Sequence, residues 1–251
     1  LKTDWNSNLV RAAMGVEDSG GYLDDPSANK QRVQTIVDAA IANDMYVIID
    51  WHSHHAEMYQ AQAIAFFQEM ATTYGNHPNV IYEIYNEPLQ IPWSTVKNYA
   101  QPVVNAIRAI DPDNLIICGT PTWSQDVDAA SNDPLSGSNI AYTIHFYAGS
   151  HDGSLRAKAQ TALDNGIALF AKEWGNVNTD SDGAVNYGET DAWMQFFKDK
   201  NISHANWSIV DKSEGASVLY PGVSATGGWS DSDLTASGLK VKDIVSNWDD
   251  M

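Results

Sequence analysis

Segments of strand type and helix type alternate from one end of this 251-residue chain to the other. Seven short runs rich in β-branched and apolar residues are typical of strands: Asn8–Val16, Met45–Trp51, Val80–Asn86, Leu115–Gly119, Ile140–Phe146, Ala168–Trp174 and Ala205–Val210. Continuous apolar runs of this kind are typical of parallel strands that are buried on both faces of a sheet. The alternation therefore predicts a parallel α/β fold.

Helical periodicity fills the gaps between these strands. After the first strand, for example, Val33, Val37 and Ala40 recur at spacings of three and four and mark one face of a helix. The predicted helices are Asn29–Asn43, Gln60–Tyr74, Val96–Ile110, Ser154–Asn165, Glu189–Asp199 and Gly238–Trp248. No internal repeat or break in composition interrupts the pattern, so we expect a single domain over residues 1–251.

A closed barrel explains the alternation better than an open doubly wound sheet. Chemistry-bearing residues end several different strands, and no turn from strand to helix carries a glycine-rich phosphate fingerprint. The active site of a (β/α)8 TIM barrel is assembled from many strand ends in this way. Seven strands are found where such a barrel needs eight, and Asp4-Trp5 is typical of the end of a preceding helix. The prediction is an N-terminally incomplete barrel whose first β/α unit is missing from this chain.

The chain is strongly acidic, with 32 acidic and 14 basic residues and a formal net charge of −18. Such a surface repels phosphate backbones and anionic lipids, so we expect neither nucleic acid nor a membrane as partner. No run approaches the roughly 20 apolar residues of a membrane span. Cys118 is the only cysteine, which excludes an internal disulfide and predicts a buried, inert thiol. A neutral substrate suits this composition.

Two glutamates stand where strands end. Glu87 closes the run that begins at Val80, and Glu173 closes the run that begins at Ala168. Most strand-end glutamates cap helices or pair with surface cations, but two carboxylates on one rim are also the minimal apparatus for cleaving a glycosidic bond. Asn86, just before Glu87, is suited to hydrogen-bond a sugar 2-hydroxyl. The pattern predicts a glycosidase that needs no cofactor.

A metal-dependent hydrolase is the rival reading of the same rim. His52 and His54 form an H-x-H pair, but His145 is the only further ligand that is suitably placed. That reading also leaves Glu87 and Glu173 unexplained, so no metal is predicted. Glu83 lies four residues before Glu87 on the same side of its strand, and we expect it to be structural and to balance Arg11.

The run Tyr82-Glu83-Ile84-Tyr85-Asn86-Glu87-Pro88 resembles the acid/base signature of glycoside hydrolase family 5. The resemblance extends to Asp50-Trp51-His52, His145-Phe146-Tyr147 and Lys172-Glu173-Trp174-Gly175. The runs at 119–126 and 206–208 are similar to those of its bacterial endo-β-1,4-glucanase branch, the cellulases that cut internal bonds. The resemblance covers nearly the whole chain, from Asp4 to about Trp248.

This resemblance implies a retaining enzyme that works by double displacement, with Glu173 as nucleophile and Glu87 as acid/base. It places Arg11 near the nucleophile. The other substrate-binding residues that it implies are His52 and His145 around the cleavage subsite, Asn86, Tyr147 against the nucleophile, Trp207 under the cleavage-site sugar, Trp123 on the leaving-group side, and Lys212 and Glu214 on the opposite side.

The same resemblance implies a β-1,4-glucan as partner and an extracellular location, although no signal peptide is present in the sequence, which begins at Leu1. We expect a monomer, unless the open sheet edge exchanges a strand with a second copy. Two alternatives stay open. A β-mannanase or xyloglucanase would share the catalytic machinery, and a catalytically impaired glucan-binding barrel would follow if the missing unit supplied essential stacking residues.

Overall fold

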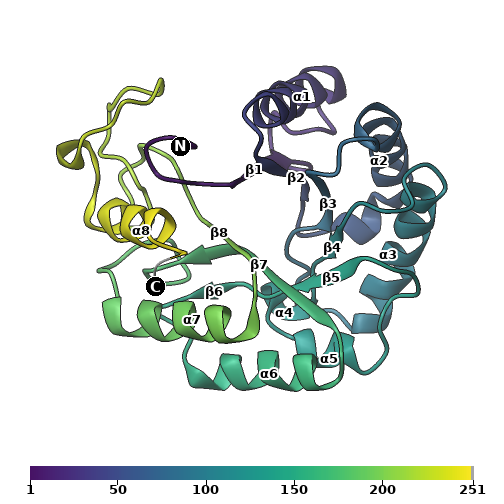
Figure 1. Ribbon diagram of the computed structural model, residues 1–251. Coiled ribbons are helices and arrows are strands. Elements are labelled where there is room, and N and C mark those ends of the chain that lie inside the picture. The colour runs from purple at the N-terminus through teal and green to yellow at the C-terminus, as the bar shows by residue number, and fades with distance from the viewer. Residues whose placement is uncertain (250–251) are drawn as a thin grey trace. The chain divides into compact units, whose positions relative to one another are not determined.

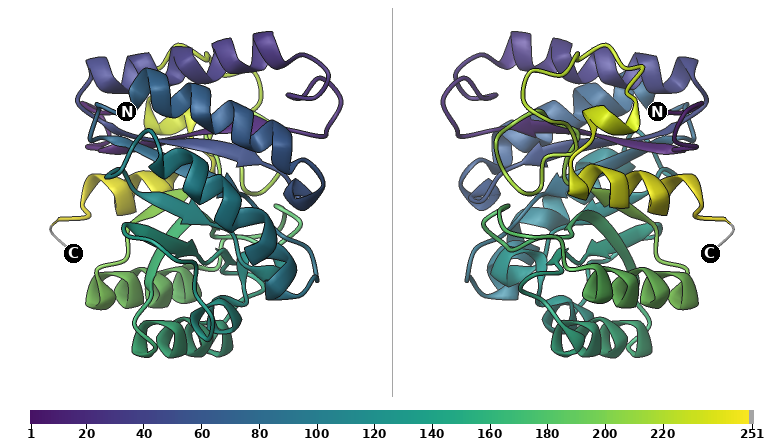
Figure 2. Two further views of the ribbon diagram at one scale, coloured as in Figure 1. Left: turned by 90° about the vertical axis from the view of Figure 1, so that its right-hand side faces the viewer. Right: turned by 90° about the vertical axis from the view of Figure 1, so that its left-hand side faces the viewer.

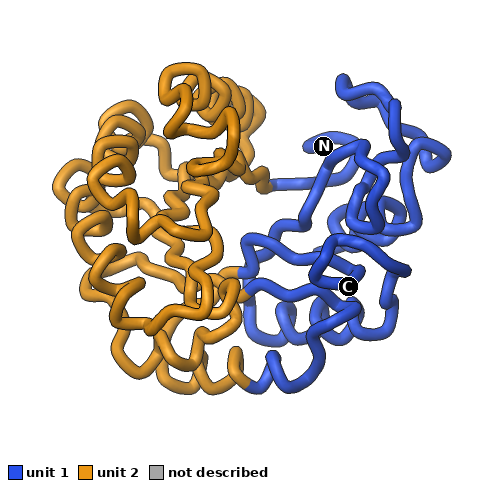
Figure 3. The backbone as a smooth tube through the Cα atoms, turned by 180° about the vertical axis from the view of Figure 1, so that it is seen from behind, with its two compact units in different colours: residues 1–8, 145–157, 171–251 blue, residues 9–144, 158–170 orange. Residues whose placement is uncertain are grey.

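The structure, a computed structural model, describes residues 1–249. It divides the chain into two compact units, shown in different colours in Figure 3. The first, here the β1–β5 unit, comprises residues 9–144 and 158–170. The second, here the β6–β8 unit, comprises residues 1–8, 145–157 and the described chain from 171 onward. The prediction of a single domain stays a prediction.

The elements follow the alternation that the sequence predicts (Figure 1). In chain order they are β1 (Leu9–Gly15), α1 (Pro26–Ala42), β2 (Tyr46–His52), η1 (Ala56–Met58), α2 (Gln60–Tyr74), β3 (Val80–Tyr85), α3 (Trp93–Arg108), β4 (Ile116–Cys118), α4 (Pro121–Ser124), α5 (Val127–Ser131), β5 (Ile140–Thr143), β6 (Phe146–Tyr147), α6 (Gly153–Asp164), β7 (Ala168–Gly175), α7 (Tyr187–Lys200), β8 (His204–Asn206), η2 (Asp231–Asp233) and α8 (Ala236–Ser246). No described helix is both long and apolar enough to cross a membrane.

The β1–β5 unit is a parallel sheet in which each strand pairs with the next along the chain, and the first residues of β7 add to β5. Helix α1 packs on β1 and β2, whereas α2 and α3 pack on β3 and on each other (Figure 2). The apolar strand residues predict this arrangement, because a parallel sheet covered by helices needs apolar side chains on both faces. All six residues of β3 are buried.

One apolar layer runs across the strands of this unit. It consists of Ile48, Ile81, Ile117, Ala141 and Phe170, each on a different strand. Two partly buried leucines pack against it, Leu9 and Leu115. Burying each large side chain of this kind stabilises the fold by about 1.5–3 kcal/mol relative to exposure. The layer fixes which strand positions lie next to it, and those positions carry the polar residues of the candidate site.

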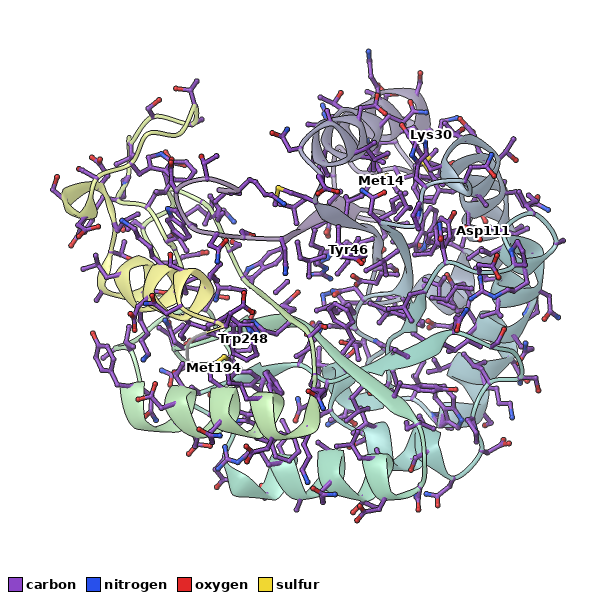
Figure 4. The ribbon with its side chains drawn as sticks, viewed as in Figure 1. Met14, Lys30, Tyr46, Asp111, Met194 and Trp248 are labelled. Carbon is purple, nitrogen blue, oxygen red and sulfur yellow. The ribbon has the colours of Figure 1, made fainter. Side chains whose placement is uncertain are left out.

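The β6–β8 unit is built around aromatic side chains. Parallel pairing joins β6 and β8 to β7. The ring of Phe146 stacks on that of Trp174 at 5.8 Å and on that of Trp193 at 4.4 Å between centroids. Figure 4 labels two further residues of this unit, Met194, which is fully buried on α7, and Trp248, which follows α8. Aromatic contacts of this kind hold the elements around β7 in place.

The predicted fold class is confirmed: the described strands and helices are those of a (β/α)8 barrel, and no first β/α unit is found among residues 1–249. The predicted elements are also found, with three local differences. The fifth predicted strand, Ile140–Phe146, is divided into β5 and β6, the last strand ends at Asn206, before the predicted Val210, and the short helices α4 and α5 follow β4. Strand β7 is irregular in its pairing with β8 between Ala171 and Trp174. Such irregularities redirect individual side chains and are common beside active sites.

Candidate active site

Period-two alternation places a polar layer beside the apolar layer of the β1–β5 unit. Each polar residue lies two positions beyond an apolar one on its strand: Arg11 on β1, Asp50 on β2 and Glu83 on β3. Both carboxylates are fully buried, and the Arg11 side chain is only 6% exposed. Buried charges of this kind must be paired to persist in a fold.

Arg11 supplies that pairing. Its Nε and Nη2 donate to the two carboxylate oxygens of Glu83 at 2.8 and 2.7 Å, which is a bidentate ion pair. Its Nη2 also lies 2.9 Å from Asp50 Oδ2 and donates to Asn86 Oδ1 at 2.6 Å. The expectation that Glu83 balances Arg11 is therefore confirmed. The arginine ties the strand-end Asn86 to the sheet.

The His52 ring is oriented by two neighbours. Its Nδ1 lies 2.8 Å from Asp50 Oδ2, and its Nε2 lies 3.4 Å from the Asn86 side-chain nitrogen. Because an amide nitrogen only donates, Nε2 must accept, and the neutral ring carries its proton on Nδ1, directed at Asp50. The 3.5 Å approach of Arg11 Nη2 to the same Nδ1 is then a contact and not a hydrogen bond. Asp50 thus sets the tautomer of His52.

Glu87 lies just past the end of β3. Its backbone N–H donates to Ser53 O at 3.2 Å, and its carbonyl accepts from His54 Nδ1 at 3.3 Å. The same Nδ1 lies 3.8 Å from the Glu87 carboxylate, whose side chain is 15% exposed. His54 is in turn held by Glu17, which accepts its backbone N–H at 2.8 Å. From the sequence, His54 is considered only as one half of an H-x-H metal-binding pair, but the structure places its ring beside this carboxylate.

Trp123 is presented by an unusual turn. The turn α4 is helical in hydrogen bonding, yet Trp123 has φ 53° and both its neighbours Thr122 and Ser124 also have positive φ. Left-handed backbone costs a non-glycine residue roughly 1–2 kcal/mol. Hydrogen bonds to the end of β3 hold it there, from Trp123 N to Pro88 O at 2.8 Å and from Ser124 Oγ to Asn86 O at 2.7 Å. Trp123 is left 38% exposed.

We expect Arg11→Met to be among the most destabilising substitutions in the β1–β5 unit. It would leave Glu83 and Asp50 buried beside each other without their shared cation, and removing one partner of a buried pair costs about 3–5 kcal/mol. Urea unfolding at pH 7 measures the loss. The double variant Arg11→Met/Glu83→Gln should recover part of it, because one of the stranded charges is gone. An unchanged urea midpoint in the single variant would show that Arg11 does not hold this layer.

Glu173 lies near the end of β7 in the other unit and is 5% exposed. The Tyr147 hydroxyl donates to Glu173 Oε1 at 3.0 Å. His145 Nδ1 lies 3.9 Å from the same oxygen, too far for a hydrogen bond. The buried Lys172 ammonium lies 2.9 Å from His145 Nε2 and donates to it, which leaves the ring proton on Nδ1, on the Glu173 side. Nothing in the sequence predicts this role for Lys172.

Gly175 makes room for Tyr147. A Cβ at Gly175 would lie 2.4 Å from Tyr147 Cδ1 and 2.5 Å from Cε1, closer than atoms can pack. We expect Gly175→Ala to displace the ring, at a cost of about 1–3 kcal/mol. Thermal unfolding should show a lower midpoint, by roughly 2–4 °C per kcal/mol. Gly188→Ala on α7 is the matched control, because a Cβ there meets nothing within 4 Å. Equal midpoints for the two variants would contradict the packing argument.

The remaining predicted residues follow β8. Trp207 donates its backbone N–H to Trp174 O at 2.9 Å, and its peptide bond to Ser208 is cis. Lys212 is exposed and Glu214 is partly buried in the long loop beyond. Among the described residues, hydrogen bonds join Arg11, His52 and Asn86 in one network. Two further bonds join Tyr147 to Glu173 and Lys172 to His145. Lys212 and Glu214 belong to neither group.

His204 on β8 is a partly buried histidine that the sequence did not single out. Its Nδ1 accepts the Trp174 indole N–H at 3.1 Å, and the Trp248 ring lies edge-on at 4.2 Å. Burial lowers the pKa of His204 to about 4. Since that pKa is below the value of about 6.5 in the unfolded chain, the stabilisation is complete above pH 6.5 and is lost as the pH falls towards 4. Over the whole interval the loss is on the order of 3 kcal/mol.

The pH dependence is therefore expected to differ between the wild type and His204→Asn. Between pH 7 and pH 5, the urea midpoint of the wild type should fall further than that of the variant, because the variant lacks the titrating ring. The other titrating groups cancel in this comparison. If the urea midpoint falls by the same amount between pH 7 and pH 5 in both proteins, the assignment to His204 is contradicted.

Comparison with known proteins gives a consistent result. The family model "Cellulase (glycosyl hydrolase family 5)" matches residues 1–213. Endoglucanase Z of Dickeya dadantii (strain 3937) is 64% identical over 249 residues, which are 99% of this chain and 57% of that protein. The chain thus spans about half the length of the curated relatives that it matches.

Solved structures agree. A protein from Cytophaga hutchinsonii superposes with a TM-score of 0.97 at 48% identity, covering 100% of this chain and 84% of that one. The catalytic domain of Thermobifida fusca endoglucanase Cel5A (E5), as a variant in complex with cellotetraose, gives a TM-score of 0.92 at 31% identity, covering 98% and 83%. The chain therefore belongs to the cellulase family, glycosyl hydrolase family 5.

Proposed function

We propose that this chain carries the catalytic machinery of a retaining endo-β-1,4-glucanase, with Glu173 as nucleophile and Glu87 as acid/base. The observation that carries the proposal is the Tyr147 hydrogen bond to Glu173 Oε1. It orients the carboxylate of a buried glutamate at the end of a strand. Membership of the cellulase family supports the assignment, and Glu87, at the end of β3, supplies the second carboxylate.

The reaction proceeds in two displacements. Glu173 attacks the anomeric carbon while the protonated Glu87 gives its proton to the departing glycosidic oxygen, so that a glycosyl ester forms on Glu173. The Glu87 carboxylate then takes a proton from a water molecule, which attacks the same carbon and releases Glu173. Each displacement inverts the configuration of the anomeric carbon, so the product keeps the configuration of the substrate. The mechanism requires the two carboxyl groups to lie about 5–5.5 Å apart when substrate is bound.

The neighbouring residues are assigned to sugar binding. Asn86, held by Arg11, presents its amide to the 2-hydroxyl, a hydrogen bond that strengthens in the transition state. His52 and His145 present rings whose tautomers are set by Asp50 and by Lys172, respectively. Fixed tautomers matter because a sugar hydroxyl must meet a donor or an acceptor in a defined place.

Aromatic and polar side chains supply the outer subsites. We assign the exposed Trp123 to the leaving-group side and Trp207 to the cleavage-site sugar, since an indole face matches the apolar face of a pyranose. Lys212 and Glu214 on the long loop are assigned to polar contacts on the opposite side. These four roles rest on the family resemblance and on the accessibility of the side chains.

A neutral β-1,4-glucan is the proposed substrate. The chain's net charge of −18 favours an uncharged polymer over an acidic one. A related catalytic domain was solved in complex with cellotetraose, and the Dickeya dadantii relative is named an endoglucanase. We further propose an extracellular, monomeric enzyme that needs neither metal nor other cofactor, because both carboxylate roles are filled by side chains.

The test is the viscosity of carboxymethylcellulose incubated with the purified, folded 251-residue chain. Internal cleavage should lower the viscosity steeply while few reducing ends appear. Mannan and xyloglucan are assayed in parallel. Preferential cleavage of either polymer would replace the proposed substrate by that one, and a folded chain that cleaves none of the three would leave a glucan-binding protein.

A further inference from the structure

A tight turn follows β6 and folds back on Tyr147, the residue that holds Glu173. The Tyr147 carbonyl accepts the backbone N–H groups of Ser150 at 2.9 Å and His151 at 2.8 Å. In the opposite direction, the Tyr147 backbone N–H donates to the His151 ring at Nδ1, at 2.9 Å. Both backbone polar groups of Tyr147 are therefore bound by this one turn.

The geometry fixes the state of the His151 ring. A backbone N–H can only donate, so Nδ1 must offer its lone pair, and the ring proton lies on Nε2. An imidazolium has protons on both nitrogens and cannot make this bond. Burial lowers the pKa of His151, and the neighbouring Asp152 offsets this only partly. The ring that faces Tyr147 is therefore neutral at neutral pH.

The surroundings hold the turn in place. The Trp193 indole on α7 donates to the His151 carbonyl at 3.2 Å. Arg156 on α6 lies over the Trp193 ring at 5.1 Å and forms an ion pair with Glu189 on α7, so these two charges neutralise each other near the turn. The charged groups that these contacts place near the turn are Asp152, which follows His151, and the Arg156–Glu189 pair, whose arginine lies over Trp193.

We propose that His151 is a positioning residue for the nucleophile. Its neutral ring fixes the backbone of Tyr147, the Tyr147 hydroxyl fixes Glu173 Oε1, and the Glu173 carboxylate is thereby aimed at the anomeric carbon. The proposal rests on the function proposed above. It assigns His151 no contact with the substrate. Because His151 acts only through Tyr147, replacing His151 should have little effect once the Tyr147 hydroxyl has been removed.

The experiment is a double-mutant cycle on an aryl β-cellobioside, read as kcat and KM. In the wild-type background, His151→Ala should lower kcat roughly tenfold to a hundredfold, as expected for a misplaced reacting group, with little change in KM. His151→Asn should restore most of kcat, since its amide oxygen can lie near the former Nδ1 position. In a Tyr147→Phe background, His151→Ala should add less than about a twofold loss, because the hydroxyl through which it acts is gone.

The outcomes separate the two proposals. If the wild type is active and the kcat losses of His151→Ala and Tyr147→Phe multiply in the double variant, the positioning role alone is overturned. A folded wild type that is inactive on all glucans and aryl glycosides would overturn the proposed function, and the positioning role with it. Should His151→Ala not fold, His151→Gln takes its place, since its longer amide cannot lie where Nδ1 lies.

Discussion

Glu173→Gln is expected to lower turnover of both cellulose and activated aryl β-cellobiosides by a factor on the order of 10⁴ or more. An amide cannot attack the anomeric carbon, so no glycosyl ester forms on either substrate. The fold should be kept, because the amide oxygen can still accept the Tyr147 hydroxyl hydrogen bond that Glu173 accepts at 3.0 Å in the wild type. The measurement is kcat on both substrates, with circular dichroism as evidence of folding.

The control for this variant is the same chemical change at a distant surface position. Glu69→Gln on α2 removes a carboxylate whose side chain is 46% exposed. In the described part of the chain this carboxylate forms an ion pair with Lys30. We expect full activity there. A Glu173→Gln protein that keeps more than a few per cent of wild-type turnover on either substrate would remove Glu173 as nucleophile. Azide rescue of Glu173→Gly, with an inverted glycosyl azide as product, would confirm the position.

Glu87→Gln is expected to separate two kinds of substrate. Cleavage of cellulose needs a proton on a poor leaving group, and loss of the general acid should lower kcat/KM by about 10²–10⁴. A nitrophenolate leaves with little help, so kcat/KM for its cellobioside should fall far less. The carboxylate lies at the end of β3 with 15% of its side chain exposed, so the amide should fit without disturbing the strand.

The ratio of the two kcat/KM values is the diagnostic quantity. It should rise by at least an order of magnitude over the wild type. His54→Gln serves as the neighbouring control, because its ring contacts Glu87 but is not assigned to proton transfer. If Glu87→Gln lowers kcat/KM by the same factor for both substrates, Glu87 does not protonate the leaving group and must have another part in the reaction.

Much of the fold could be predicted from the sequence because buried parallel strands have a simple signature. The runs that became β2 and β3 are almost entirely apolar, and period-two alternation within them also predicted that Glu83 would balance Arg11. The turn around Trp123 could not be predicted. No glycine marks its left-handed backbone, which is held by hydrogen bonds to the end of β3, a segment over thirty residues earlier.

The candidate site could be predicted in part, for a similar reason. Glu87 and Glu173 were identified because a strand end is a local feature of the sequence. The partners that set ring tautomers were not, since Lys172 reaches His145 across 27 positions of sequence. His151 was missed because a single histidine in a turn has no local signature. Only the folded backbone shows that its ring accepts from Tyr147.

The stereochemistry of cleavage tests the double displacement most directly. Proton NMR of cellopentaose hydrolysis, recorded within the first minutes, shows the anomeric configuration of the new reducing ends before they mutarotate. The pairing of Glu173 as nucleophile with Glu87 as acid/base predicts that the β-anomer appears first and the α-anomer later. Initial appearance of the α-anomer would mean a single displacement by water, and would contradict a covalent intermediate on Glu173.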